Sequence, residues 1–411
     1  MPVLNILSGS YCGAEEVVLD VAKKTGFPYM DDALLIAETA KRFQIDEGKI
    51  RKALDGKTSI FNKFTYEKER CLAYLKRAVA DVLERDDLLY AGWAGLMIPR
   101  NISHVLNICL IADAKYRTAI ACRIDLVSER DALKKIHKED ERLSLLVEQI
   151  LGKKDPWSTQ LHDIVIPLNK SSHEDAVRLI CDSFKSSVLT ATADSIGAVR
   201  DFTLAAEVNV KLTMAGHNVA VSSHDGAVVM EINKHVIMLS SLEDDLKKLA
   251  LSVPGVVSAA AKVGPGYYQS DVYRKFDFDV PSPSKVLLVD DEREFAETLS
   301  ERLQMRDYAS AAVYGGEEAL AIVEEDEPEV MVVDLKMPGI DGLEVLRQVK
   351  EKHPNVEVIV LTGHGSEEVA RRCLELGACA YLEKPVDIEK LTRAMQEAYE
   401  KARANKRKAS S

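Results

Sequence analysis

Four short apolar segments in the last third of the sequence each lead into a polar residue. Those residues are Asp290 and Asp291 after KVLLV, Asp334 after VMVV, Thr362 at the end of VIVLT, and Lys384 after AYLE. Continuous runs of Val, Leu and Ile separated by helical patterns are typical of strands buried on both faces of a parallel sheet. Ligands bind at the carboxyl ends of the strands in such sheets. We therefore expect three carboxylates, a hydroxyl and an ammonium group to meet in one crevice.

The chemistry of this crevice favours acceptance of a phosphoryl group. Mg²⁺ binds one or two carboxylates together with water and substrate oxygens, which suits Asp290 and Asp291. Asp334 is placed as the nucleophile, because a carboxylate can attack phosphorus and store the group as an acyl phosphate. Lys384 would neutralise charge on the transferring oxygens. The hydroxyl of Thr362 would contact the same oxygens once Asp334 is modified, so it is the expected switch.

These residues resemble the receiver domain of two-component response regulators over about residues 284–402. The resemblance implies a flavodoxin-like (βα)5 fold in which Asp290 and Asp291 form the acidic pair, with Asp291 as the direct metal ligand. It also implies that Asp334 is the phosphorylated aspartate and that the backbone carbonyl of Lys336 is a further ligand of Mg²⁺. An acidic pair after a strand can instead be a helix N-cap. Here, however, five positions agree in order and in strand placement.

The same resemblance assigns Thr362 and Lys384 to the switch and cation positions, and Tyr381 to the rotating aromatic. A cis peptide bond costs little energy before a proline. Such a bond before Pro385 would help to direct the Lys384 side chain into the pocket. The loop MPGIDG after Asp334 supplies turn residues before a helix. The implied partner is a sensor histidine kinase or a phosphotransfer protein.

Composition and charge narrow the setting in which this site works. The chain has 411 residues, enough for two to four domains, and no stretch of about 18 uncharged apolar residues that could span a membrane. Its start lacks a basic leader with a cleavage site, and its seven cysteines are scattered without a CxxC spacing. The net charge of −12 disfavours a protein that coats nucleic acid. We expect a cytoplasmic protein with no membrane span, nucleic-acid partner, disulfide or structural zinc.

Two changes in composition divide the chain. The segment VPSPSK is the clearest linker, because its prolines and serines cannot continue a helix or a central strand. A second change, from a helical pattern to small polar and Ala-rich sequence, falls near residues 185–200. We predict an α/β multidomain chain with domains at 1–186, 196–276 and 285–403, a linker at 277–284 and a basic tail at 404–411.

The amino-terminal segment has the pattern of strand, turn and helix, whose unpaired N–H groups and positive helix end favour an anion. If Gly13 is the second glycine of a P-loop, GxxxxGK[ST], then Ala14 stands at the lysine, with Glu15 and Glu16 beside it. A carboxylate about 4 Å from a phosphate oxygen opposes binding by about 4 kcal/mol at an effective dielectric constant of about 20. These residues therefore indicate a degenerate P-loop and disfavour an active kinase.

The order of elements over residues 1–186 resembles the cytidylate kinase-like family of nucleoside monophosphate kinase folds. The family has GSGG where this chain has YCGA, and Gly-Arg-Gly where it has GWA. Asp140 and Arg142 match the Asp and Arg of the family's lid helix only loosely. The resemblance implies a site for a nucleotide, ATP or CMP, with Gly13 and Arg117 as candidate contacts. A surface arginine on a helix is more often solvated than bound to a ligand.

The middle segment, residues 202–266, has the pattern of a small α+β domain. Asp225 and Gly226 stand between two alternating runs and tolerate positive φ, which predicts a hairpin. The DG turn and the later VPGV resemble a BON-type domain, although the family's TG after the second strand is replaced by NK. Such domains are associated with membranes or envelope partners. Nothing basic or amphipathic here demands lipid, so we expect protein contact or coupling between modules.

These observations leave three functions open. The first is a phosphorelay response regulator that is phosphorylated on Asp334 and signals through its upstream modules to an unidentified protein. The alternative is a receiver-regulated nucleoside monophosphate kinase that uses ATP and Mg²⁺, and the third is a phosphorelay scaffold. No helix-turn-helix follows the receiver, so transcriptional control is not expected. An apolar stripe of Leu391, Met395 and Tyr399 would serve a homodimer or pack on the receiver's own sheet.

Overall fold

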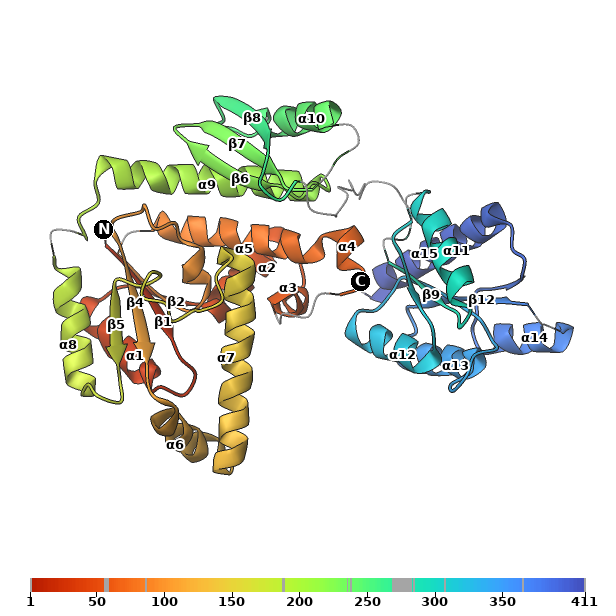
Figure 1. Ribbon diagram of the computed structural model, residues 1–411, viewed down its shortest axis with the longest axis horizontal. Coiled ribbons are helices and arrows are strands. Elements are labelled where there is room, and N and C mark those ends of the chain that lie inside the picture. Colours follow the sequence, from red (N-terminus) through yellow and green to blue (C-terminus); the bar gives the residue numbers. More distant parts are fainter. Residues whose placement is uncertain are drawn as a thin grey trace. The chain divides into compact units, whose positions relative to one another are not determined.

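The chain folds into two compact units (Figure 1). One consists of Met1–Lys57 with Glu67–Tyr273, and the other of Thr58–Tyr66 with Arg274–Ser411. The structure, a computed structural model, describes residues 2–54, 59–85, 87–186, 189–234, 236, 239–267, 283, 285–306, 308–363 and 366–409. The predicted linker at 277–284 lies outside the described residues except for Pro283. Both upstream domains predicted from the sequence fall in the first unit, and the boundary between them stays a prediction.

A five-stranded parallel sheet forms the centre of the first unit, in the order β2-β3-β1-β4-β5. Its central strands are apolar along most of their length because helices cover both faces of the sheet. The strands are β1 (Val3–Ser8), β2 (Tyr29–Asp31), β3 (Leu88–Ala91), β4 (Val105–Ile111) and β5 (Ile164–Pro167).

Several helices of this unit begin at polar caps or end at left-handed residues. Ser128 and Ser172, for example, accept hydrogen bonds from the third residue of the helix that each precedes. Gly26 closes the first helix with a φ of 71°. The helices are α1 (Ala14–Thr25), α2 (Asp32–Phe43), α3 (Glu47–Leu54), α5 (Glu67–Leu83), the short 3₁₀ helix η1 (Ala94–Met97), α6 (Ala114–Asp125), α7 (Glu129–Leu151) and α8 (His173–Phe184).

The middle segment adds a long helix and a three-stranded sheet to the first unit. The predicted hairpin is confirmed, because Asp225 and Gly226 have φ values of 49° and 80° between antiparallel strands β6 and β7. Strand β8 pairs parallel with β7, which gives the order β6-β7-β8. The elements are α9 (Ala193–Met214), β6 (Ala220–His224), β7 (Ala227–Ile232), α10 (Leu239–Leu251) and β8 (Ser258–Val263).

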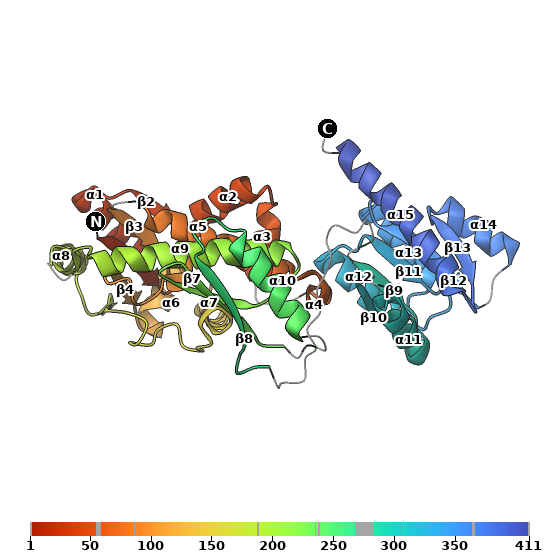
Figure 2. The same cartoon turned by 90° about the horizontal axis from the view of Figure 1, so that it is seen from above.

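Helix α9 belongs to two apolar cores at once. It lies along α5 in both ribbon views (Figures 1 and 2), and its Phe202 and Ala206 are buried in the core beside the five-stranded sheet. Val208 and Leu212, further along the same helix, are buried in the core of the three-stranded sheet. An Arg77–Glu207 ion pair of 2.6 Å also joins α5 to α9. The two predicted upstream domains therefore share a helix.

The second unit contains a second five-stranded parallel sheet, in the order β10-β9-β11-β12-β13. This is the 2-1-3-4-5 order of flavodoxin-like folds, as predicted. Its elements are α4 (Asn62–Thr65), β9 (Val286–Val289), α11 (Arg293–Gln304), β10 (Ser310–Val313), α12 (Gly316–Glu325), β11 (Val330–Val333), α13 (Gly342–Lys352), β12 (Glu357–Thr362), α14 (Glu367–Glu375), β13 (Ala380–Glu383) and α15 (Ile388–Ala409).

The apolar stripe on α15 packs on the receiver's own sheet. Leu391 and Met395 have no exposed surface and share a core with strands β9 and β12, and Tyr399 packs against the same core. These residues are consequently not a free face for a second copy of the chain. The sequence led us to expect that this stripe would serve either a homodimer or its own sheet. The burial of its side chains rules out a homodimer through this stripe.

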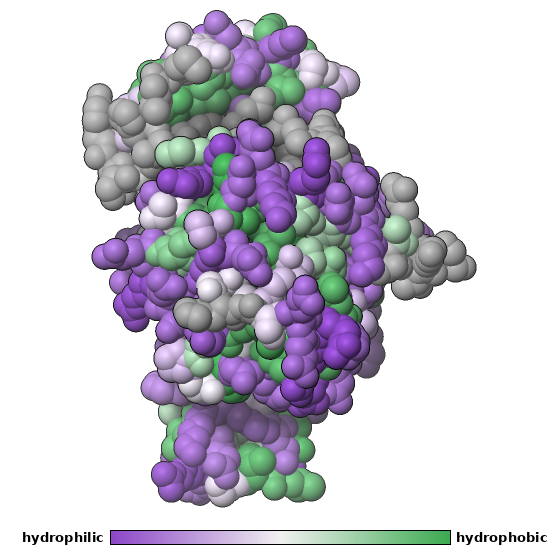
Figure 3. Space-filling model, turned by 90° about the vertical axis from the view of Figure 1, so that its right-hand side faces the viewer, coloured by the Kyte–Doolittle hydropathy of each residue, from purple (hydrophilic) through white to green (hydrophobic). Residues whose placement is uncertain are grey.

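Charged and polar side chains cover much of the face of the molecule in Figure 3, with hydrophobic residues between them. Among the helices that the structure describes, none combines the length and the apolar character needed to cross a membrane.

Replacing Phe202 with Ala should lower the free energy of unfolding of the first unit by about 3–5 kcal/mol, because it leaves a cavity in a shared core. Denaturant unfolding followed by tryptophan fluorescence measures this, since Trp93 and Trp157 both lie in that unit. Ile196→Ala is the control, because Ile196 lies on the same helix and is 37% exposed. Equal losses of stability in the two variants would contradict a packing role for Phe202.

Candidate functional site

The polar residues predicted to converge lie at one edge of the second unit's sheet. Asp290 follows β9, Asp334 follows β11, Thr362 ends β12 and Lys384 follows β13. Because these strands are parallel, their carboxyl ends share an edge. The Nζ atom of Lys384 lies 2.6 Å from Oδ2 of Asp290 and 3.1 Å from Oδ2 of Asp334. The backbone N–H of Lys384 donates to the carbonyl oxygen of Thr362 at 2.9 Å.

Burial makes this ion-pair cluster electrostatically strong. The side chains of Asp290 and Asp334 are each 7% exposed, and that of Lys384 is 11% exposed. Burial raises the pKa of Asp290, although the hydrogen bond from Lys384 opposes the shift. Burial alone would lower the pKa of Lys384, but its hydrogen bonds to Asp290 and Asp334 outweigh that effect and raise the pKa. A buried charge of this kind is tolerated only with such partners.

Glu292 is a third carboxylate of the cluster, and the sequence analysis missed it. Its Oε1 lies 3.2 Å from Nζ of Lys384, although its side chain is 68% exposed. Carboxylate oxygens of Asp290, Glu292 and Asp334 all lie within 4.8 Å of one another. Asp291 is exposed and lies outside this group, so its assignment as the direct metal ligand stays a prediction. The only sequence signal for Glu292 is its place directly after the acidic pair.

The cluster fits a small divalent cation. Three carboxylates converge on a partly dry crevice, and the positive charge now among them is the ammonium group of Lys384. Oxygen ligands of this kind match the preference of Mg²⁺ for carboxylates with free positions for other oxygens. The backbone of Lys336 belongs to the same loop, since its N–H lies 3.4 Å from Oδ1 of Asp334. The role of its carbonyl group stays a prediction.

Several backbone features shape the crevice. The Lys384–Pro385 peptide bond is cis. A side chain at Gly342 would collide with the carbonyl oxygen of Asp334, so the loop after the aspartate closes only over a glycine.

Of the two predicted switch residues, Thr362 is buried and Tyr381 is partly buried. Thr362 is 1% exposed. The hydroxyl of Tyr381 is buried and, within the described part of the chain, makes no hydrogen bond.

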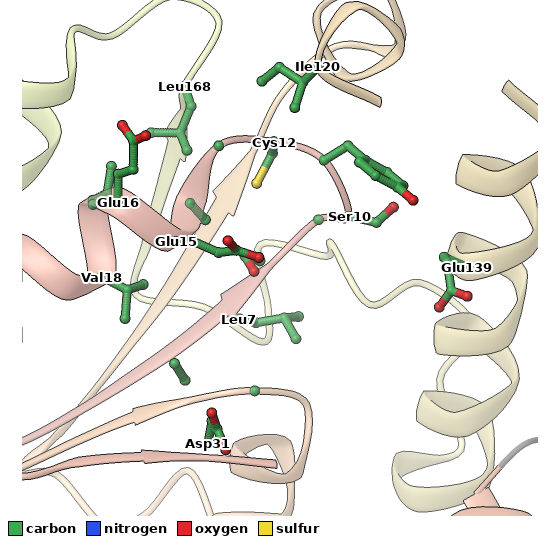
Figure 4. Close-up of a pocket in the computed structure, with 18 of the residues that line it drawn as sticks. Leu7, Ser10, Cys12, Glu15, Glu16, Val18, Asp31, Ile120, Glu139 and Leu168 are labelled. Atoms are coloured by element: carbon green, nitrogen blue, oxygen red, sulfur yellow. The ribbon is translucent and has the colours of Figure 1, made fainter. Parts of the chain in front are cut away.

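The first unit holds a separate cleft of about 1050 Å³ at the carboxyl ends of β1, β2 and β3 (Figure 4). The predicted turn, residues 10–14, lines it, and Gly13 adopts a φ of 77° just before α1. The strand, turn and helix predicted from the sequence therefore have the expected arrangement. In Figure 4, Glu15 extends from the start of α1 toward the space beside Ser10.

The charge that lines this cleft is mostly negative. Six carboxylates and two guanidinium groups line it, from Glu15, Glu16, Asp31, Asp32, Glu139, Asp140, Arg123 and Arg142. The lysine that neutralises phosphate oxygens in a P-loop has no counterpart among these lining residues. The strand, turn and helix therefore border a cleft whose lining carries more carboxylates than cationic groups.

Arg117, the predicted nucleotide contact, is hydrogen-bonded to two residues that line the cleft. Its guanidinium group makes two hydrogen bonds to Asp140, of 2.7 and 2.9 Å, and two of 2.7 Å to the carbonyl oxygen and Oγ of Ser10. The residue is 8% exposed and is not among those that line the cleft. These four hydrogen bonds give the guanidinium group internal partners, and its role as a nucleotide contact stays a prediction. Arg117 fastens α7 to the turn, because Asp140 lies on α7.

Asp32 is a buried carboxylate among the residues that line this cleft, and the sequence analysis did not single it out. Its carboxylate accepts hydrogen bonds from the hydroxyl of Tyr90 at 2.6 Å and from the N–H groups of Trp93 and Ala94 at 2.9 and 3.1 Å. Burial raises its pKa, and these hydrogen bonds oppose that shift. The pair of aspartates after a short strand, Asp31 and Asp32, is the signal that could have found it.

Comparison with known proteins agrees with the geometry of both units. A family model described as response regulator receiver domain matches residues 286–396, and one described as cytidylate kinase-like family matches residues 3–170. A parallel sheet with a lysine-bridged aspartate pair at its carboxyl edge defines the class of receiver domains.

Three relatives illustrate the similarity. Sporulation initiation phosphotransferase F of Bacillus subtilis is 33% identical over 112 residues, which are 27% of this chain and 90% of that protein. Response regulator MprA of Mycolicibacterium vanbaalenii is 36% identical over 114 residues, which are 28% of this chain and 49% of that protein. The signal receiver domain of a putative Luxo repressor protein from Vibrio parahaemolyticus has 28% identity and a TM-score of 0.29, and covers 30% of this chain and 95% of its own.

The chain belongs to the response regulator family through its receiver domain. Its amino-terminal part carries the cytidylate kinase-like match. The chain spans about half the length of MprA, so the similarity to that protein concerns the receiver alone.

Replacing Asp290 with Asn should weaken Mg²⁺ binding by at least about tenfold, or about 1.4 kcal/mol, because it removes one full charge from a buried site. Glu292→Gln should have a smaller effect, since exposed charges are screened. Isothermal titration calorimetry of the full chain measures both. Glu301→Gln, on the exposed side of α11, is the control. Unchanged affinity in Asp290→Asn would exclude that carboxylate as a ligand.

Proposed function

We propose that the protein is a phosphorelay response regulator that accepts a phosphoryl group on Asp334. The observation that carries this proposal is the buried cluster in which Lys384 contacts both Asp290 and Asp334. A sensor histidine kinase or a phosphotransfer protein supplies the group, as the receiver match implies. The absence of a membrane-spanning helix among the described residues is consistent with the proposed cytoplasmic location.

The transfer is a displacement at phosphorus. A carboxylate oxygen of Asp334 attacks the phosphorus of the partner's phosphohistidine, an O–P bond forms, and the P–N bond breaks with its electron pair leaving on the histidine nitrogen. Lys384 neutralises the charge that spreads over the transferring oxygens. When Mg²⁺ is bound, Asp290, Asp334 and Glu292 or Asp291 would hold it, with the carbonyl of Lys336, and it supplies further positive charge to those oxygens.

Thr362 and Tyr381 are the proposed switch. Thr362 lies at the carboxyl end of β12, next to the strand that leads into Asp334, so its hydroxyl can bind a phosphoryl oxygen there. The hydroxyl of Tyr381 has no hydrogen bond to lose within the described residues, so rotation of the ring costs no polar contact. Phosphorylation would therefore alter the surface around β13.

The first unit is proposed to act as an output body that receives this signal and passes it to an unidentified protein. Its cleft keeps the geometry of a nucleotide site, while its carboxylates oppose catalysis on a triphosphate. Gly13 still forms the turn, so weak binding of ATP or CMP is compatible with the site. The BON-like nature of the middle segment and its role in coupling are part of the same proposal.

Asp334→Ala should abolish phosphorylation by a small phosphodonor with Mg²⁺, because it removes the proposed nucleophile, the carboxylate that follows β11 and contacts Lys384. Intact-mass measurement of the full chain should give one added phosphoryl group in the wild type and none in the variant. Glu301→Gln should behave as the wild type. An equal gain in wild type and Asp334→Ala would refute the assignment of the site.

The second candidate function is a receiver-regulated nucleoside monophosphate kinase, which the cytidylate kinase-like match favours. The full chain with ATP, CMP and Mg²⁺ should form no ADP above the background of a protein-free control, because the cleft lacks the phosphate-binding lysine. A coupled assay for ADP measures this before and after phosphodonor treatment. Turnover that disappears in an Asp32→Asn variant would replace the output-body proposal with the enzyme.

A further inference from the structure

A short segment that interrupts the first unit belongs to the receiver. Residues Thr58–Tyr66 are grouped with Arg274–Ser411, although the chain before them forms α3 and the chain after them forms α5 of the first unit. The segment contains the four-residue helix α4, Asn62–Thr65 (Figure 1). The receiver is therefore assembled from two separate stretches of sequence.

The apolar contact of this segment is made by Phe61. Its side chain has no exposed surface and lies in one apolar cluster with residues of β9, α12 and α13, among them Leu287, Val323 and Val349. A phenylalanine buried this completely indicates packing like that of a domain core. The neighbouring Ile60 is 37% exposed, so only one of the two adjacent apolar side chains enters the cluster.

Polar contacts fix the position of the segment. The hydroxyl of Ser59 donates a hydrogen bond to Asp326, whose other carboxylate oxygen lies 2.6 Å from Nζ of Lys285. The same hydroxyl accepts the backbone N–H of Phe61 at 3.1 Å, which sets the turn that presents the ring. Asp326 follows α12 and Lys285 precedes β9, so these contacts lie at the amino-terminal edge of the sheet. Asp334 lies at the opposite, carboxyl edge of the same sheet.

We infer that Ser59–Tyr66 is an intramolecular docking peptide whose receptor is the apolar core cluster that Phe61 shares with residues of β9, α12 and α13 in the receiver of the same chain. Four helical residues are too short to be stable alone, so α4 depends on this receptor for its shape. The chain connects peptide and receptor, which raises the effective concentration of the peptide far above that of a free one. The inference does not depend on phosphorylation of Asp334.

The first test uses the wild-type chain. Amide hydrogen exchange at Thr65 and Tyr66, whose N–H groups donate to the carbonyl oxygens of Phe61 and Asn62, should be slowed by at least about 100-fold relative to a synthetic peptide of residues 57–67. The chain should sediment as a monomer at the same concentration. Unprotected amides would overturn the inference. Protection that appears only with a dimer would overturn it too, because a second copy would then be the occupant.

The second test compares Phe61→Ser with Ile60→Ser in the full chain. Loss of the ring should speed amide exchange in α12 and in the loop to β11 by about tenfold or more, because local opening there no longer exposes a packed aromatic side chain. Ile60→Ser should leave that exchange unchanged, and β1 and β4 of the first unit should be unaffected in both variants. Equal behaviour of the two variants, or an effect confined to the first unit, would refute the docking role.

Discussion

The ammonium group of Lys384 is the contact on which the receiver site depends. Two aspartates whose side chains are each 7% exposed stand close together, and their mutual repulsion would oppose folding without a cation between them. Lys384 meets that requirement from a third strand and also lies 4.4 Å from the ring of Phe295. The site is thus a stable arrangement of charge before any phosphoryl group arrives. In this arrangement Lys384 can exchange its carboxylate partners for phosphoryl oxygens.

The two parallel sheets of the chain both place carboxylates at the carboxyl ends of their strands, and they differ in the cations that accompany those carboxylates. In the receiver, a lysine accompanies the carboxylates at the carboxyl ends of the strands. In the first unit, that edge collects carboxylates, while Arg117 is engaged by Asp140 and Ser10. The lysine of the receiver can neutralise phosphoryl oxygens, whereas no lysine is among the described residues that line the cleft of the first unit. This difference supports the proposal of a phosphoryl acceptor in one unit and an output body in the other.

The receiver site could be predicted because each of its main residues ends an apolar strand, and strand order then determines where their side chains meet. Asp290, Asp334 and Lys384 were placed in this way. Glu292 could not be, since an exposed glutamate near a helix start is ordinary and only the distance to Lys384 distinguishes it. The hydrogen-bond partners of Arg117 could not be predicted either, because they depend on how α7 folds back over the turn. Phe61 could not be assigned to the receiver core, because that assignment depends on a contact between residues more than two hundred positions apart.

Residues 58–66 lie between elements of the first unit in the sequence but belong to the receiver in the structure. This has a consequence for biosynthesis. These residues leave the ribosome more than two hundred residues before the first receiver strand, a delay of roughly ten to forty seconds at translation rates of 5–20 residues per second. Throughout that interval Phe61 has no native partner and is a target for chaperones or for misassociation. Phe61 becomes buried when the receiver is complete. The last third of the protein therefore protects a segment that is made near the beginning of the chain.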